Sequence, residues 1–114
     1  MSNTPNLDLE LVPANSFQPW ESINDTLQLI DALLHLAVLD KDENDPPTTV
    51  SGDAGKRWIV GSTPTGAWAG YAGYVALCTG ADLWRFIEPK EGFEAWVIDE
   101  GVKYRYESSA WTVA

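Results

Sequence analysis

Apolar and polar positions follow a helical period between about residues 19 and 39, which predicts one α-helix. Pro19 suits the first turn of a helix, and acidic residues after it suit the positive N-terminal end. Leucines on an adjoining face should leave this helix apolar on much of its circumference. The main apolar seam consists of Ile23, Leu27, Ile30, Leu34 and Ala37.

The first 18 residues show no sustained period and contain several polar residues and prolines. This predicts an extended N-terminal arm that becomes ordered against a neighbour. Within it, Leu7, Leu9 and Leu11 alternate with polar residues, a pattern suited to adding a strand to a sheet edge in the same or another subunit. We therefore divide the chain into a docking arm, residues 1–18, and one domain, residues 19–114.

An acidic run over residues 40–45, followed by Pro46 and Pro47, predicts the end of the helix and a solvated linker. Its alternating carboxylate and amide side chains resemble the start of a calcium-binding loop. However, Asp45 stands where that loop needs glycine, and Ser51 stands where it needs a bidentate glutamate. We therefore expect no metal ion here.

The second half of the chain has short runs of aromatic and β-branched residues, separated by turn-forming residues. This predicts a small antiparallel β-meander or sandwich of five or six strands, and with the helix an α+β fold. In the turn 99–101, Gly101 should adopt the left-handed conformation. The predicted strands are residues 57–60, 73–79, 83–87, 94–98, 103–106 and 111–113.

Six tryptophans are present, and in a small β domain most of them should form the core. Trp68 differs because it lies in a loop of small residues, close to Tyr71. There we expect its ring to fill a hollow on a neighbouring protein or to stand out as a glycan platform. Trp68 and Tyr71 are thus the candidate glycan or protein contacts.

With 114 residues the chain can form one modest core. So small a domain buries a limited share of its surface, and contact with further copies would bury more, which favours a homo-oligomer. Its net charge of -10 disfavours nucleic acid and membrane partners. The N-terminus shows neither a secretory signal nor a transmembrane pattern, so we expect synthesis in the cytoplasm. Cys78, the single cysteine, should pack as a small apolar residue.

No phosphate-binding loop and no nucleophile elbow is recognisable, and His35 lies alone in the apolar helix. We therefore expect no catalytic residues and no cofactor. A small glycosidase remains a minor alternative because carboxylates occur among the tryptophans. These carboxylates, mostly in predicted turns, are Asp82, Glu88, Glu91, Glu94, Asp99 and Glu100.

Several short motifs, taken in order, resemble the domain of unknown function 2793, a family of phage and gene-transfer-agent proteins often found in tail fibres and spikes. Two departures are Pro19-Trp20, where family members commonly end a glutamine-rich segment with lysine, and Ser108-Ser109-Ala110, which replaces an Asp-Gly turn. The matching motifs are Thr4-Pro5-Asn6-Leu7, Asn24-Asp25, Leu27, Ile30-Asp31-Ala32-Leu33, Pro46-Pro47, Gly66-Ala67-Trp68-Ala69-Gly70, Trp84-Arg85-Phe86, Pro89, Gly92 and Trp111.

The resemblance implies a structural component of a tailed-phage or phage-like virion, in a tail fibre, spike or baseplate. Its partners would be other virion proteins and further copies of itself, with a trimer favoured by analogy and by the helix seam. Such a protein would be made in the host cytoplasm and act in the virion during assembly and host attachment. The alternative is a module that binds a host surface glycan.

Overall fold

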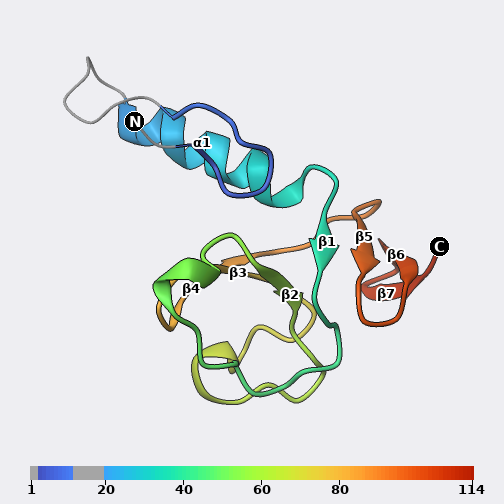
Figure 1. Cartoon of the computed structure of the whole chain (residues 1–114). Coiled ribbons are helices and arrows are strands. Elements are labelled where there is room, and N and C mark those ends of the chain that lie inside the picture. Colours follow the sequence, from blue (N-terminus) through green and yellow to red (C-terminus); the bar gives the residue numbers. More distant parts are fainter. Residues whose placement is uncertain (1–2, 12–19) are drawn as a thin grey trace. The chain divides into compact units, whose positions relative to one another are not determined.

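The computed structural model of the chain describes residues 3–11 and 20–114, which belong to two compact units, Met1–Leu34 and His35–Ala114 (Figure 1). The described part of the first unit holds one helix, α1 (Trp20–Leu33). The second unit holds short strands and two 3-10 helices, η1 (Ser51–Asp53) and η2 (Gly66–Trp68). The predicted α+β class is confirmed.

The strands of the second unit form two sheets. The first has the order β1-β5-β6-β7, with β1 parallel to β5 and the other pairs antiparallel. The second has the order β2-β3-β4 and is antiparallel. The bounds are β1 (Ala37–Val38), β2 (Arg57–Ile59), β3 (Val75–Gly80), β4 (Leu83–Ile87), β5 (Glu94–Val97), β6 (Val102–Glu107) and β7 (Ala110–Val113).

All six strands predicted from residue 57 onward are present, with ends shifted by a few residues. Gly101 has a φ of 66°, as predicted for the turn between β5 and β6. The backbone N–H of Gly101 donates to the Val97 carbonyl at 2.8 Å, which closes this turn. Turn residues and the runs of aromatic and β-branched residues between them therefore placed these strands correctly.

The helix is shorter than predicted and ends at Leu33 instead of near residue 39. Leu34 still donates its N–H to the Ile30 carbonyl, but His35 has a φ of 52°, a left-handed conformation that terminates a helix. Ala37 lies in β1, so it is not a member of the helix seam. The apolar run 36–39 fits a helical face and a buried strand equally well, which explains the error.

The segment 36–40 is hydrogen-bonded to both sheets, and Figure 1 shows β1 between β2 and β5. On one side, Trp96 and Ile98 of the β5 region donate their N–H groups to the carbonyls of Leu36 and Val38, at 2.9 and 2.8 Å. On the other side, Leu39 donates to the Arg57 carbonyl at 2.9 Å, and Ile59 donates to the Asp40 carbonyl at 3.0 Å. This short segment therefore joins the two sheets.

The predicted linker after β1 packs along the chain near residues 61–65 instead of running free in solvent. The Glu43 carbonyl accepts the N–H of Gly61 at 2.8 Å, and the Asn44 side chain accepts the N–H of Thr63 at 3.0 Å. A Cβ atom at Gly61 would overlap the Asn44 side-chain oxygen and would lie only 2.9 Å from the Glu43 carbonyl oxygen, so this close backbone approach requires glycine. The acidic composition did not reveal these backbone contacts.

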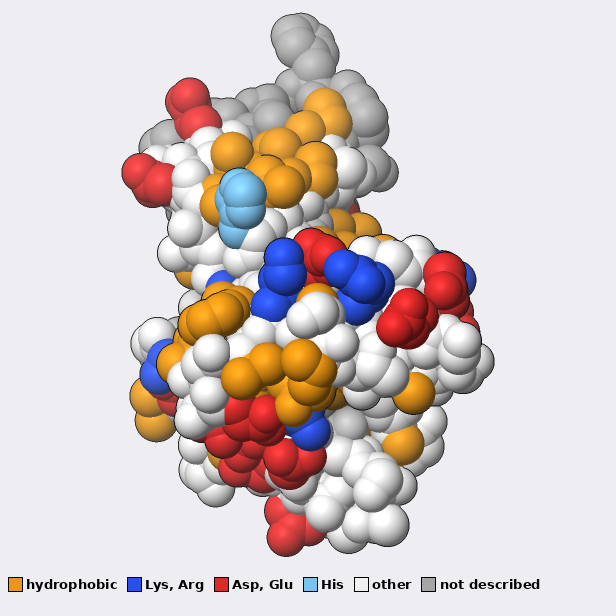
Figure 2. Space-filling model, turned by 90° about the vertical axis from the view of Figure 1, so that its right-hand side faces the viewer, with side chains coloured by type: hydrophobic (Ala, Val, Ile, Leu, Met, Phe, Trp, Pro, Cys, Tyr) orange, Lys and Arg blue, Asp and Glu red, His pale blue; other side chains and the backbone are white. Residues whose placement is uncertain are grey.

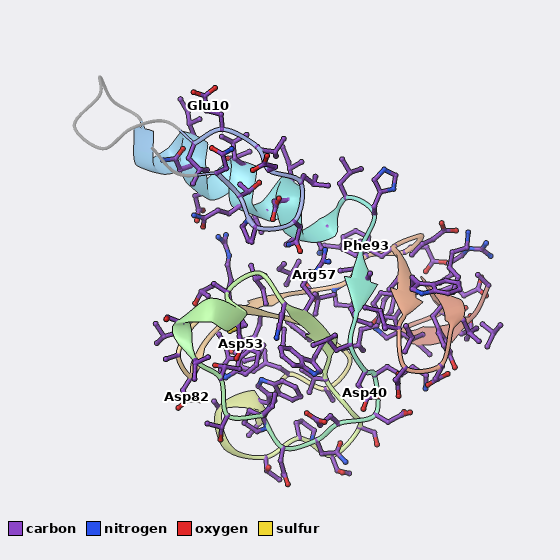
Figure 3. The ribbon with its side chains drawn as sticks, in the orientation of Figure 1. Glu10, Asp40, Asp53, Arg57, Asp82 and Phe93 are labelled. Atoms are coloured by element: carbon purple, nitrogen blue, oxygen red, sulfur yellow. The ribbon has the colours of Figure 1, made fainter. Side chains whose placement is uncertain are left out.

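Thr49 is hydrogen-bonded to Asp82, which is labelled in Figure 3, and this joins the loop before η1 to the turn between β3 and β4. The Thr49 N–H donates to the Asp82 carboxylate at 3.0 Å, and the Asp82 N–H donates to the Thr49 hydroxyl oxygen at 2.7 Å. The Thr49 hydroxyl also donates to the Gly80 carbonyl at 3.0 Å. Asp82, one of the candidate glycosidase carboxylates, thus stabilises a turn.

Three indole rings form the centre of the second unit. The ring centroids of Trp58, Trp68 and Trp84 lie between 5.2 and 6.3 Å apart in tilted and edge-to-face arrangements. Cys78 is buried in the same cluster, as predicted. Trp68 is 0% exposed, so the prediction of a protruding ring is wrong. The helix η2, which starts at Gly66 with a φ of 57°, turns the loop so that this ring packs in the core.

The described part of the predicted arm, residues 3–11, folds back on itself instead of extending as a strand. Asn3 and Glu10 form an isolated antiparallel bridge, and Asp8, with a φ of 59°, reverses the chain between them. The Thr4 N–H donates to the Leu9 carbonyl at 2.8 Å. Alternating leucines therefore did not predict a strand, because the left-handed residue in their middle interrupts the extended conformation.

Asp31 of α1 holds this loop against the helix. Its carboxylate accepts the N–H of Leu7 at 2.5 Å and both the N–H and the side-chain amide of Asn6 at 2.9 to 3.2 Å. Burial alone would raise the pKa of Asp31, but hydrogen bonds from Thr4, Leu7 and Asn6 lower the pKa below its ordinary value. The side chain is 2% exposed, so its charge is stabilised almost wholly by the loop.

We expect Trp68→Ala to lower the free energy of unfolding by about 3–5 kcal/mol, because it removes a buried indole from the core. The matched control is Trp96→Ala, since Trp96 is 47% exposed and should cost less than about 1 kcal/mol. Urea denaturation of both variants measures the difference. Similar losses in the two variants would contradict the placement of Trp68 in the core.

The contact of Asp31 with the loop should depend on pH. Because the pKa of Asp31 lies below the ordinary 3.8, its contribution to stability is present above that pH and is lost as the pH falls through the lowered pKa. In an NMR titration, the amide signals of Asn6 and Leu7 should shift with this low pKa. Asp31→Asn should abolish the shift and cost about 1–3 kcal/mol, whereas a midpoint above 3.8 would contradict the assignment.

Candidate functional site

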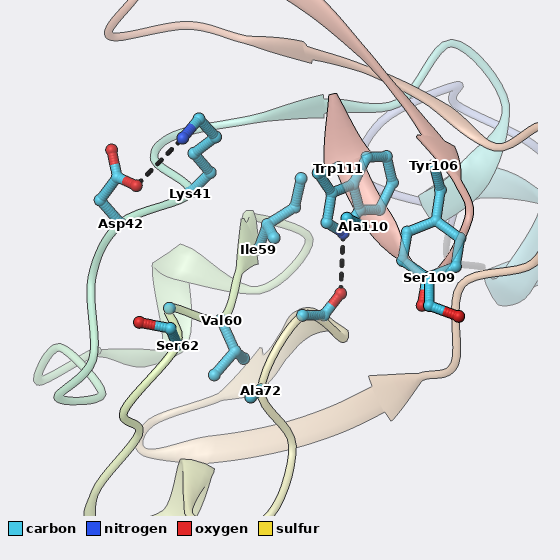
Figure 4. Close-up of a pocket in the computed structure, with 12 residues that line it drawn as sticks. Lys41, Asp42, Ile59, Val60, Ser62, Ala72, Tyr106, Ser109, Ala110 and Trp111 are labelled. Atoms are coloured by element: carbon cyan, nitrogen blue, oxygen red, sulfur yellow. Dashed lines mark hydrogen bonds and ion pairs between the residues drawn. The ribbon is translucent and has the colours of Figure 1, made fainter. Parts of the chain in front are cut away.

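A groove of about 350 Å³ lies between the two sheets of the second unit (Figure 4). One side is formed by the end of β2 and the loop before β3, and the other by the hairpin of β6 and β7. The segment after β1 contributes to the rim. The lining residues are Lys41, Asp42, Ile59, Val60, Gly61, Ser62, Ala72, Gly73, Tyr106, Ser109, Ala110 and Trp111.

A tight turn after β1 positions the two charged residues of the groove. The carboxylate of Asp40 accepts the backbone N–H groups of Lys41 and Asp42 at 2.7 and 3.0 Å. The Lys41 ammonium group then lies 3.0 Å from the Asp42 carboxylate, 3.7 Å from that of Glu100 and 4.8 Å from the centroid of the Tyr104 ring. Lys41 is thus held by opposite charges and an aromatic face.

These contacts determine the charge of Lys41. Burial alone would lower its pKa, but the hydrogen bond and charge of Asp42, together with Tyr104 and Glu100, raise the pKa above the ordinary value. Lys41 therefore remains protonated at neutral pH. Among the residues that line the groove, its positive charge balances the negative charge of Asp42.

Trp111 connects the two sides of the groove. Its indole Nε1–H donates to the Gly73 carbonyl at 2.8 Å, as Figure 4 shows. Gly73 has a φ of 80°, a conformation that glycine adopts readily. Across the hairpin, Trp111 pairs with Tyr106, and their ring centroids lie 5.2 Å apart at an angle of 63°. Two adjoining aromatic rings therefore line the groove.

A second candidate surface lies on α1 and the turn after it. Ile23, Ile30 and Leu34 are 42%, 44% and 50% exposed, and Leu27 between them is half-buried. We call these four residues the apolar stripe. Figure 2 shows apolar side chains gathered on the viewed face of the unit that holds α1. Asp31, which binds the loop 3–11, follows Ile30 and lies about 100° further round the helix. The loop therefore contacts the helix beside the stripe.

The structure separates the two residues predicted as surface contacts. Trp68 is buried, whereas Tyr71 is 37% exposed and stacks on Phe86 with ring centroids 3.8 Å apart. A role of Tyr71 in binding stays a prediction. The same holds for the docking role of Leu7, Leu9 and Leu11, which are half-buried in the loop.

None of the candidate glycosidase carboxylates lines the groove. Glu94 pairs with Lys103 and Arg105, Glu88 pairs with Lys90, and Glu100 accepts a hydrogen bond from the Tyr104 hydroxyl. Within residues 3–11 and 20–114, no group of three or more His, Cys, Asp or Glu side chains is arranged to hold a metal ion. In the same part of the chain, no helix is long and apolar enough to span a membrane.

Sequence reasoning missed the groove because its parts are distant along the chain. Trp111 and Gly73 are 38 residues apart, and Lys41 comes from the segment predicted as a linker. The only local signal was the spacing of Tyr106 and Trp111, which places them opposite each other in a hairpin. That signal does not indicate which loop lies across from the hairpin.

Residues 23–112 match a family model described as "Protein of unknown function (DUF2793)". The chain belongs to this family. The matched residues include most of α1, strands β1 to β6 and all of β7 except Val113, and so also the groove and the apolar stripe. None of the curated proteins compared matches the chain.

Proposed function

We propose that this DUF2793 protein is a structural subunit of a tailed-phage or phage-like particle, located in a tail fibre, spike or baseplate. In this role the protein contributes to assembly and host attachment and does not act as an enzyme. The observation that carries the proposal is the apolar stripe on a small acidic protein. The resemblance of the sequence motifs to proteins of phage tail fibres and spikes also supports it.

The proposed occupant of the stripe is the same stripe on a further copy of the chain. Between Ile23 and Leu34 the stripe extends for about 16 Å of helix. Its spacing of four, three and four residues is the spacing of helix pairs that pack side by side. An interface of like helices round a symmetry axis buries these residues, and a trimer is the assembly we favour.

Other virion proteins are the second class of proposed partner. The loop 3–11 presents Leu7, Leu9 and Leu11 beside α1, and this surface suits docking to a larger fibre or baseplate protein. The final location is then the virion, after synthesis in the host cytoplasm. The groove is a separate feature, because it lies entirely in the second unit.

We expect the purified full-length chain to have a multiple of its 12.5 kDa mass in light scattering. Leu34→Asp should reduce this mass to that of the monomer, because a charge in the stripe would have to be buried at the interface. The matched control is Leu83→Asp, since Leu83 is 59% exposed and lies in β4, outside the stripe. Circular dichroism should show both variants folded.

Two results would contradict this assembly. One is a monomeric wild-type protein, and the other is equal dissociation in Leu34→Asp and Leu83→Asp. Either result would mean that the stripe is covered by a different protein or by another part of the same chain.

The virion role makes a separate prediction. Particles purified from the producing cells should contain the protein in a reproducible copy number, measured by quantitative mass spectrometry. In particles assembled with the Leu34→Asp variant, this number should fall, while Leu83→Asp should leave it unchanged. Absence of the wild-type protein from particles would refute the proposed function.

A further inference from the structure

We propose that the groove between the two sheets binds a neutral carbohydrate, with one hexopyranose ring of a polysaccharide as the unit recognised. This inference goes beyond the proposed structural role and does not depend on it. The proposed binding residues are Tyr106, Trp111 and the Lys41–Asp42 pair, in place of Trp68, which is buried.

The size of the groove suits a small polar ligand. Binding sites for small molecules have volumes of roughly 300–1,000 Å³, and the groove, at about 350 Å³, lies at the lower end. Its two sides are held together by the Trp111–Gly73 hydrogen bond and by the segment 36–40. The site is therefore formed before a ligand arrives, which lowers the entropy cost of binding.

The lining combines aromatic rings with hydrogen-bonding groups, as a pyranose ring requires. A pyranose has C–H groups on its faces and hydroxyl groups around its edge. The weakly positive C–H groups favour the negative face of an aromatic ring, which Tyr106 and Trp111 can provide. The hydroxyl groups can bond to Asp42, Ser62 and Ser109, all exposed at the groove.

The charges of the groove favour an uncharged sugar over an acidic one. Lys41 is already paired with Asp42, so it has little attraction left for a carboxylate ligand. The net charge of -10 also repels anionic polysaccharides. Figure 2 shows Asp and Glu side chains gathered on the viewed face of the second unit, in line with this repulsion.

The test is an NMR titration of the ¹⁵N-labelled full chain with methyl glucoside, cellobiose, lactose and N,N'-diacetylchitobiose as neutral probes. Glucuronic acid serves as the anionic probe. At least one neutral sugar should shift the Trp111 indole N–H signal together with the amide signals of Gly61 and Ala72. Glucuronic acid should shift these signals less at equal concentration.

Filling the groove should weaken this binding. Ser62→Trp places a large ring at the rim and should raise the Kd of the neutral sugar by at least about tenfold. The matched control is Thr79→Trp, at an exposed position of β3 that does not line the groove, and its Kd should equal that of the wild type. Neither position is buried, so both variants should fold.

A second pair of variants tests how the charge of the groove affects binding. Asp42→Asn releases Lys41 from its nearest carboxylate and should increase the binding of glucuronic acid relative to methyl glucoside. Glu88→Gln changes the net charge equally but outside the groove, and it should leave this ratio nearly unchanged.

Three results would overturn the inference: no shift with any neutral sugar, shifts confined to residues outside the groove, or an unchanged Kd in Ser62→Trp. Stronger binding of glucuronic acid than of every neutral sugar would overturn the assignment to neutral carbohydrate. Because the variants of the apolar stripe lie in the first unit, failure here leaves the proposed self-association intact, and the reverse also holds.

Discussion

The second unit depends on one short segment, residues 36–40, which is hydrogen-bonded to both sheets. Each sheet has only three or four short strands, so its stability in water depends on packing an apolar face against other parts of the chain. The segment gives the two sheets one shared backbone connection, and Leu39 within it packs against the Trp58–Trp68–Trp84 cluster on the β2–β3–β4 side. Its own side chains match this position, since Leu36 and Val38 are buried.

The groove follows from the same connection. The backbone carbonyl of Asp40 accepts the N–H of Ile59 in β2, and the Asp40 carboxylate accepts the N–H groups of Lys41 and Asp42, which places these two residues at the rim. On the far side, the Trp111–Gly73 hydrogen bond holds the β6–β7 hairpin to the loop before β3. The groove between the two sheets is thus lined by residues from four separate stretches of sequence. In the first unit, Asp31 has a comparable role, because it fastens a loop that has little structure of its own.

The parts of the fold that were predictable are those controlled by neighbouring residues. The strands from β2 to β7 follow aromatic and β-branched runs with turn residues between them, so local preference and tertiary structure agree. The end of α1 was not predictable from the period, since Leu36–Leu39 suits a helix face or a strand and the choice depends on partners in β5 and β2. The position of Trp68 was predicted wrongly for a similar reason. The small residues around it allow many loop conformations, and they do not indicate whether the ring packs in the core or faces solvent. The groove needed contacts between distant residues, which no local pattern contains.

The most direct test of this account is amide hydrogen exchange by NMR at Leu39, Ile59, Trp96 and Ile98, whose N–H groups join segment 36–40 to the two sheets. If this segment holds the sheets together, all four amides should be protected and should exchange at similar rates through one cooperative opening. Rapid exchange at Leu39 and Ile59, with protection kept at Trp96 and Ile98, would show that segment 36–40 is held by the β5 region and not by β2. That result would contradict the connection between the two sheets that forms the groove.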